Sequence, residues 1–151
     1  MEGNIIRKNL KKLKDEKVML TGTVERYGLK KEYIGGKSIT LCLTDVQVRN
    51  KDGEVETIDH AWIKVGKTLA QKNIPTGSVL QMNCHVKEYF KGYVGFDREI
   101  GDLVDHRTLD YGIQRASKIE ILHYGQGKFF KDFYHEVRQK DFISNKYEEL
   151  A

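Results

Sequence analysis

Apolar and polar residues alternate with a period of two through much of the chain, which indicates β-strands. The pattern is clearest in residues 38–65, at Ile39, Leu41, Leu43, Val46 and Val48. The parity of these positions changes between Leu43 and Val46, and one inserted residue near position 44 or 45 explains the change as a β-bulge. Residues 50–53, Asn-Lys-Asp-Gly, predict a turn because Asp tolerates and Gly favours a positive φ. We therefore expect residues 38–65 to form a long bulged hairpin, a device that curls a sheet into a barrel.

The same period of two predicts three further strands, at residues 17–27, 78–90 and 112–122. A narrow apolar stripe at helical spacing predicts an N-terminal helix over residues 4–16, and a broader one predicts a C-terminal helix beginning near residue 127. A short helix is expected within residues 66–77, where Pro75 ends it. The remaining segments are expected to be loops or tails, namely residues 28–37, 88–99, 100–110 and those from Asp141 onward.

The strand that returns from the turn has two interpretations. If Ala61 and Ile63 fill the core, Trp62 lies on the outer face beside His60, where its ring is free to stack against a ligand. In the opposite phase Trp62 is a core residue, a common role for tryptophan. The sequence leaves both phases open.

Composition limits the class of protein. The chain has 151 residues, 32% charged and 39% hydrophobic, which predicts one domain with a small core. No apolar run approaches the roughly 18 residues of a membrane span, and the N-terminus has no signal-peptide pattern, so we expect a cytoplasmic protein. Cys42 and Cys84 fall within predicted strands, and we interpret them as buried thiols.

No motif supports catalysis or a cofactor. The five histidines are scattered without the spacing of metal ligands. No segment resembles a nucleophile elbow. Residues 124–128, Tyr-Gly-Gln-Gly-Lys, lack the first glycine spacing and the hydroxyl residue of a phosphate-binding loop. We therefore expect a protein that is not an enzyme and that needs neither a metal nor another cofactor.

The order of predicted elements resembles the OB fold, the five-stranded oligonucleotide- or oligosaccharide-binding barrel, over residues 17–124. The segment VMLTGTVERY looks like its first strand with a mid-strand glycine, ITLCLTDV looks like its second strand, and GKTLAQKN occupies the slot of its helix. The resemblance implies a mainly β fold, a five-stranded OB-like barrel with a short N-terminal helix and a C-terminal helix. It divides the chain into a basic helix at 1–16, a barrel at 17–124 and a helix and tail at 125–151.

The resemblance also implies a binding site, because OB domains bind ligands across the second and third strands, between the first-to-second and fourth-to-fifth loops. In this sequence those loops are residues 28–37 and 88–99, which combine cations, aromatic rings and glycines. Cations suit phosphates and rings suit unstacked bases, so we expect single-stranded DNA or RNA as the partner. The net charge of +4 permits a polyanion. The candidate nucleic-acid-binding residues are Lys30, Lys31, Tyr33, Lys37, Trp62, Lys87, Tyr89, Lys91, Tyr93, Phe96 and Arg98.

A second hypothesis places the protein in another class. OB domains are found in small proteins of phages and mobile elements, and such a protein can inhibit a nucleic-acid-handling enzyme, for example a CRISPR effector nuclease, by binding its basic groove. Four acidic residues near the second loop suit that role, namely Asp97, Glu99, Asp102 and Asp105. Homodimerisation through the C-terminal helix, by Phe129, Phe133 and Val137, is compatible with either function. The basic face of the N-terminal helix is either solvated or directed at phosphates.

Overall fold

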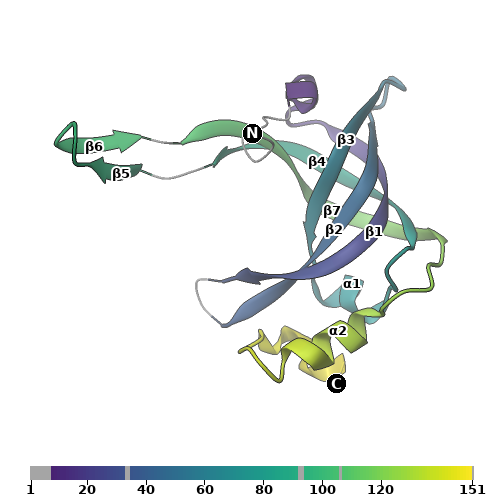
Figure 1. Cartoon of the computed structure of the whole chain (residues 1–151). Coiled ribbons are helices and arrows are strands. Elements are labelled where there is room, and N and C mark those ends of the chain that lie inside the picture. The colour runs from purple at the N-terminus through teal and green to yellow at the C-terminus, as the bar shows by residue number, and fades with distance from the viewer. Residues whose placement is uncertain (1–7, 33–34, 92–93, 106, 151) are drawn as a thin grey trace.

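A curled antiparallel sheet forms the body of the protein (Figure 1). The structure, a computed structural model, describes residues 8–32, 35–91, 94–105 and 107–150. The sheet has the order β3-β2-β1-β4-β7, and its strands are β1 (Lys17–Lys31), β2 (Lys37–Arg49), β3 (Val55–Lys64), β4 (Val79–Lys91) and β7 (Thr108–His123). A second sheet pairs β5 (Val94–Asp97) with β6 (Asp102–Asp105). The prediction of a mainly β chain is confirmed.

The expected closure into a barrel is wrong, because no ladder joins the two edge strands, β3 and β7, in the described part of the chain. The physical reason lies in β7. Arg115 and Lys118 have φ values of 58° and 51°, and the register between β4 and β7 shifts twice opposite this segment. Such bulges bend a strand and interrupt its row of backbone hydrogen-bonding groups. This part of β7 therefore cannot offer β3 a regular edge for pairing.

The bulge expected in β2 is confirmed. While β1 advances two residues from Thr21 to Thr23, its partner in β2 moves three residues, from Gln47 to Thr44. Within this interval Asp45 has a φ of 51°, a conformation that aspartate tolerates better than most side chains. The extra residue accounts for the parity change of the apolar positions, since both Leu43 and Val46 are fully buried.

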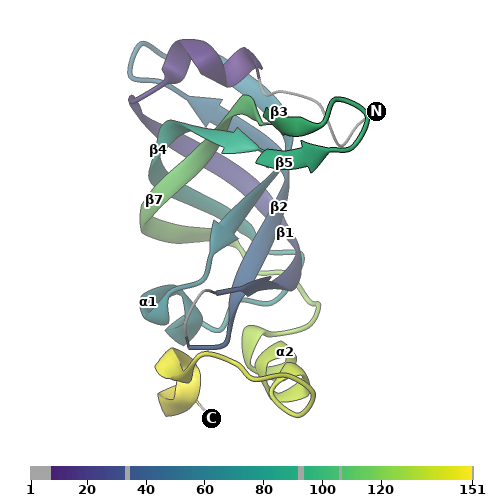
Figure 2. The same cartoon turned by 90° about the vertical axis from the view of Figure 1, so that its left-hand side faces the viewer.

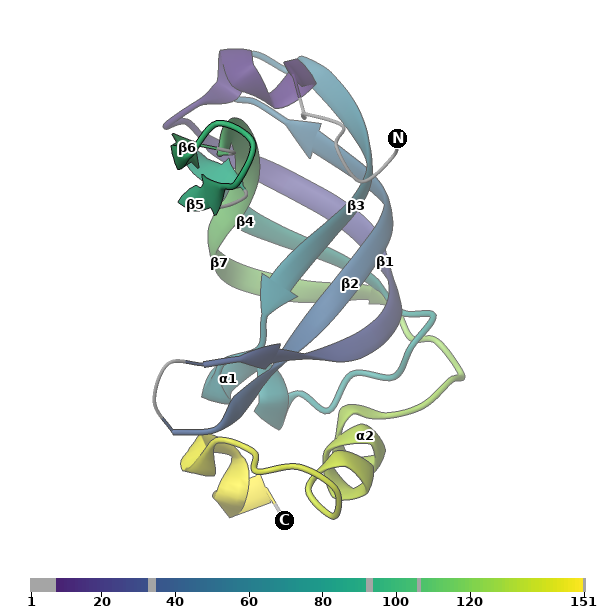
Figure 3. The same cartoon turned by 60° about the vertical axis from the view of Figure 1, so that its left-hand side comes forward.

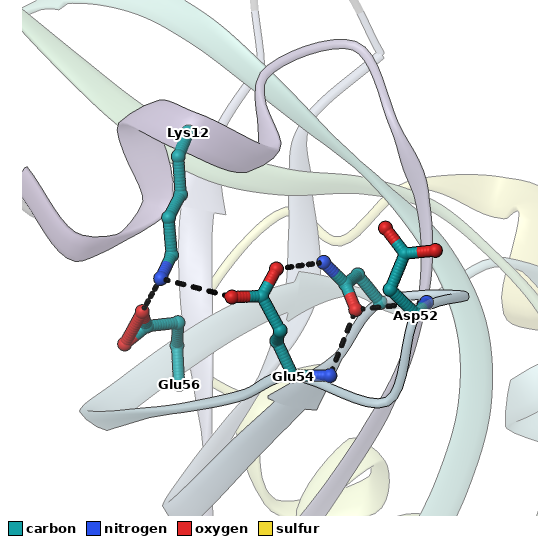
Figure 4. Close-up of polar contacts among 5 residues, drawn as sticks. Lys12, Asp52, Glu54 and Glu56 are labelled. Carbon is teal, nitrogen blue, oxygen red and sulfur yellow. Dashed lines mark hydrogen bonds and ion pairs between the residues drawn. The ribbon is translucent and has the colours of Figure 1, made fainter.

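The turn between β2 and β3 is also as predicted. Gly53 has a φ of 86°, and the Asn50 side-chain oxygen accepts hydrogen bonds from the backbone N–H groups of Asp52 and Glu54 at 3.0 and 2.9 Å (Figure 4). Asn50 in turn donates to the Glu54 carboxylate at 3.1 Å. The turn is thus fixed by one asparagine side chain.

The described part of the N-terminal helix is a 3-10 helix, η2 (Lys8–Leu13), which covers one end of the sheet. Leu10 and Leu13 are buried in the core. Lys12 lies 2.5 Å from the Glu56 carboxylate and 4.0 Å from that of Glu54 (Figure 4). The hydrogen bond to Glu56 raises the pKa of Lys12. This lysine therefore ties the helix to β3 rather than facing away from the protein.

Two helices lie at the other end of the sheet (Figure 2). As predicted, α1 (Lys67–Gln71) buries Leu69 and Ala70. The second helix, α2 (Phe130–Val137), buries Phe130 and Tyr134, and the Phe130 ring packs edge-on against Tyr27 at 5.4 Å. Of the residues that the sequence offered for dimerisation, Phe133 and Val137 pack partly buried against the core, whereas Phe129 is 43% exposed. None of the described helices has the length and apolar character to cross a membrane.

The chain between β7 and α2 packs against the turn that precedes β4. The Ser78 hydroxyl donates to the Pro75 carbonyl at 2.7 Å and accepts the Gly125 N–H at 2.9 Å. A Cβ atom at Gly125 would overlap backbone atoms of Thr76 and Gly77. Only glycine therefore allows the two backbone segments to approach this closely.

The C-terminal segment, expected to be a loose tail, is instead packed against the sheet. It ends in a second 3-10 helix, η3 (Asn145–Leu150), in which Tyr147 is fully buried. The Tyr147 hydroxyl donates to the Val65 carbonyl at 2.6 Å and accepts the Ile39 N–H at 3.0 Å. The prediction failed because one buried tyrosine and one buried isoleucine, Ile143, anchor the segment without any periodic pattern.

Where loops were predicted over residues 88–110, the described residues 88–91, 94–105 and 107–110 form a projecting β-hairpin instead. The pairing of β4 with β7 runs outward to Lys91 opposite Thr108. Beyond it, β5 and β6 pair from Val94 opposite Asp105 to Asp97 opposite Asp102. We call residues 94–105 the arm, which projects from the body of the protein (Figure 1).

Candidate functional site

A cavity of about 930 Å³ lies where the two edges of the sheet face each other, and we call it the seam cavity. Its walls come from the ends of β1 and β3, from α1, and from residues 113–119 of β7. Lys146 of η3 completes the wall. Apolar side chains line part of it, namely Ile63, Leu69, Ile113 and Ile119. The cavity thus occupies the gap that remains in the body of the protein because β3 and β7 do not pair.

Of the residues that the structure describes, the charged ones lining the seam cavity are all basic. They are Lys30, Lys64, Lys67, Lys72, Arg115, Lys118 and Lys146. Four of these, Lys30, Lys72, Arg115 and Lys118, form neither an ion pair nor a side-chain hydrogen bond with any described residue. A concave surface with cations of one sign concentrates a positive potential and attracts anions.

One carboxylate stands beside this cluster. Glu32 lies 2.8 Å from the Lys64 ammonium, and hydrogen bonds from Lys64 and then Ser38 lower the pKa of Glu32 to about 2. Lys146 donates to the Ser38 hydroxyl at 2.9 Å. Burial and the neighbouring charge of Lys64 lower the pKa of Lys146. Glu32 therefore offsets part of the charge at one end of the cavity only.

Two of the cations sit on strained backbone. Positive φ is a costly conformation for residues other than glycine, by roughly 1–3 kcal/mol each, and asparagine and aspartate tolerate it best. The other described non-glycine residues with positive φ are Asp15, Asp45 and Asn73. Arg115 and Lys118 have no such tolerance, and both line the seam cavity. Strain of this kind is concentrated at functional sites, where the surrounding structure holds it in place.

Trp62 lies on the outer face of β3, which resolves the phase that the sequence left open. Its side chain is 40% exposed and lines the cavity. The ring packs against Gly28, where an added Cβ would come within 3.1 Å of it. The Arg26 guanidinium lies 5.1 Å from the ring centroid, within the range of a cation–π contact. The indole is therefore held in place at the wall of the cavity.

Among the described residues proposed from sequence, only Lys30 and Trp62 line the seam cavity. Lys31 is exposed at the end of β1. Lys37 instead pairs with Asp141 at 2.7 Å. These findings keep the outer face of β3 and the end of β1 in the candidate site but remove Lys37 from it.

The candidates from the second predicted loop are spread along the hairpin rather than gathered at the cavity. Lys87 pairs with Asp15 at 3.0 Å, and the Tyr89 hydroxyl donates to Asp110 at 3.2 Å while its ring covers Gly112. Phe96 and Arg98 belong to the arm. These described residues lie in paired strands or in the turn between β5 and β6 and project outward, and none of them lines the seam cavity.

The remaining candidates are not placed. Tyr33 and Tyr93 lie outside the described residues, and so does the side chain of Lys91, whose backbone is in β4.

Sequence reasoning missed most of the cations of the cavity, namely Lys64, Lys67, Lys72, Arg115, Lys118 and Lys146. One signal was present in β7. Residues 114–118, Gln-Arg-Ala-Ser-Lys, are a polar run inside an otherwise alternating strand, which is what a bulged edge looks like in sequence. The others come from three separate elements, and only the fold brings them together.

Comparison of the chain with protein-family models, with curated proteins and with solved structures gives no match. Among the described residues, no three His, Cys, Asp or Glu side chains are grouped so as to hold a metal ion.

Proposed function

We propose that this protein binds single-stranded DNA or RNA in the seam cavity without catalysing a reaction. The observation that carries the proposal is the wall of seven basic residues with no acidic residue among the described lining. A single strand presents phosphates to such cations and presents base faces to apolar and aromatic groups. Trp62, Ile63 and Leu69 supply those groups in the same cavity.

The architecture supports the proposal through its likeness to an OB domain. The strand order β3-β2-β1-β4-β7 is that of a five-stranded barrel opened between its third and fifth strands, and α1 follows the third strand. OB domains bind nucleic acid across strands two and three. Here Thr40 of β2 and Trp62 and Lys64 of β3 line the cavity. The proposed site therefore combines the surface of β2 and β3, where OB domains bind their ligands, with the cavity between β3 and β7.

The size of the cavity favours a single strand over a duplex. About 930 Å³ is the size of a pocket that encloses one small ligand. Such a pocket accepts an unstacked base and its phosphates, whereas the bases of a duplex are stacked and paired. We therefore expect tighter binding to single strands than to duplexes of the same sequence.

Fluorescence anisotropy with labelled single- and double-stranded DNA and RNA oligonucleotides, at low and high salt, tests the proposal. We expect Trp62→Ala to weaken single-strand binding by about 5- to 150-fold, the equivalent of roughly 1–3 kcal/mol of stacking. Trp62→Phe keeps a ring and serves as the matched control. An absence of binding at low salt, or equal loss in the alanine and phenylalanine variants, would overturn the proposal.

A second candidate function rests on the arm. Its acidic residues project from the body of the protein and suit the basic groove of a nuclease, so the protein is also a candidate inhibitor encoded by a phage or mobile element. Co-purification from the native host after nuclease treatment separates the two functions. A stable nuclease partner lost in an Asp97→Asn/Asp102→Asn variant favours inhibition, whereas recovery of nucleic acid alone favours strand binding.

A further inference from the structure

The arm exposes an apolar surface that nothing in the described chain covers. Phe96 and Leu103 face each other across β5 and β6, and each is 65% exposed. Ile100 in the turn is 66% exposed, and Val94 is 49% exposed. A cluster of four large apolar side chains on one projecting element is typical of a surface that meets a partner.

The arm also lacks support of its own. It is a two-stranded hairpin with four residues in each strand. Hairpins of this kind are marginally stable in water unless a third strand or another surface packs on them. A partner that packs on the arm would therefore stabilise the hairpin as well as cover its apolar residues.

The charge of the arm is opposite to that of the seam cavity. Residues 94–105 contain four acidic residues, Asp97, Glu99, Asp102 and Asp105, and one basic residue, Arg98, which gives a net charge of −3. The described part of the cavity lining contains seven basic and no acidic residues, together with apolar groups such as Ile63 and Ile119. Both the charge and the apolar character of the arm are thus matched by the cavity.

We propose that the exposed apolar side chains of the arm, Phe96, Ile100 and Leu103, insert into the seam cavity of a second copy of this chain, so that two copies exchange arm contacts in a closed dimer. The arm leaves the sheet on the side from which the β1–β2 hairpin also projects, and the end of that hairpin contributes Lys30 to the cavity wall (Figure 3). In a twofold dimer each copy gives one arm contact and receives one, so both contacts are satisfied at once. Such an arrangement closes on itself and needs no further copies.

The exchange has a consequence for ligand binding. The acidic arm and a nucleic-acid strand use the same cations, so each displaces the other from the cavity. Dimerisation itself does not require nucleic acid. Dimerisation is therefore tested on protein free of nucleic acid. A monomeric protein in that test would overturn the dimer but would leave the proposed strand binding standing.

The first experiment measures the mass of the full-length protein by light scattering after size exclusion, over a range of concentrations at low and high salt. We expect a dimer at low salt that dissociates as salt is raised, because screening weakens the contact between arm and cavity. Phe96→Ser/Leu103→Ser and Asp97→Asn/Asp102→Asn are each expected to raise the dissociation constant by about tenfold or more. Far-ultraviolet circular dichroism confirms that these surface variants keep the fold.

The decisive experiment reverses charges on both sides. Arg115→Glu/Lys118→Glu is expected to abolish the dimer, and combining it with Asp97→Lys/Asp102→Lys is expected to restore it. Phe129→Ser on α2 is the control and should leave the dimer intact. A wild-type protein that stays monomeric at low salt, a dimer that survives the arm variants, or a charge reversal without rescue would each overturn the proposal.

Discussion

Removing the charges of Arg115 and Lys118 tests whether the seam cavity holds phosphates. The substitution Arg115→Gln/Lys118→Gln keeps polar, somewhat shorter side chains on the same strained backbone but removes two positive charges. Neither residue forms an ion pair with a described residue, so no partner carboxylate is left exposed by the change. Any loss of affinity then reports contacts with the ligand.

The magnitude follows from the number of available cations. If Lys30, Lys72, Arg115 and Lys118 each neutralise one phosphate, the logarithm of the binding constant falls with the logarithm of salt with a slope of about −2.8, or −0.7 for each contact. Between about 50 and 200 mM salt, binding of the wild type then weakens roughly 50-fold. With two contacts removed, the slope falls to about −1.4 and the loss to roughly 7-fold.

Anisotropy titrations of a labelled single strand at several salt concentrations give both slopes. The control is Lys11→Gln/Lys17→Gln, which removes the same charge from exposed residues that do not line the cavity. We expect the control to keep the wild-type slope. Equal slopes for the wild type and the cavity variant, or an equal reduction in the control, would refute the assignment of phosphate contacts to the cavity.

Three further predictions concern the fold that holds the site. Tyr147→Phe removes two buried hydrogen bonds of the hydroxyl and is expected to lower the free energy of unfolding in urea by about 1–3 kcal/mol, whereas the exposed Tyr124→Phe should leave it unchanged. Gly125→Ala forces two backbone segments apart and is expected to lower the free energy of unfolding by about 1–3 kcal/mol or more. A Cβ atom at Gly66 meets no other atom, so Gly66→Ala should leave stability nearly unchanged, and equal effects of the two variants would contradict the packing at Gly125. Burial raises the pKa of Cys84 to about 12, so this thiol should not react with a thiol reagent at pH 8 until urea unfolds the protein, and reaction in the native state would contradict its placement.

The elements with a regular period were predictable from sequence, and those stabilised by single contacts were not. The bulge near Asp45, the turn at Gly53 and the burial of Leu69 followed from local pattern, because each depends on residues close together in the chain. The packed C-terminal segment depends on the Tyr147 hydroxyl reaching Ile39 and Val65, at separations that no local pattern reports.

The candidate site was predictable only in part, for a similar reason. Trp62 and Lys30 were identified from the loop and strand that carry them. Lys72 and Lys118 join them because the sheet stays open at β7, and the sequence predicted a closed barrel instead. Residues 88–99 were expected to be loop because cations and glycines alternate with their aromatic rings, and residues 100–110 because they are polar. The structure instead pairs β5 with β6, for example Phe96 opposite Leu103.

The open seam leaves two strand edges, which expose backbone groups to edge-to-edge aggregation. Bulges and lysine or arginine side chains on an edge are common protections against such pairing, and β7 carries both at Arg115 and Lys118. The same residues that we assign to ligand binding therefore also protect the edge of β7 from pairing with another molecule and aggregating. Engineered variants that remove the charges of Arg115 and Lys118 will need other charged residues on β7 to stay free of aggregates at high protein concentration.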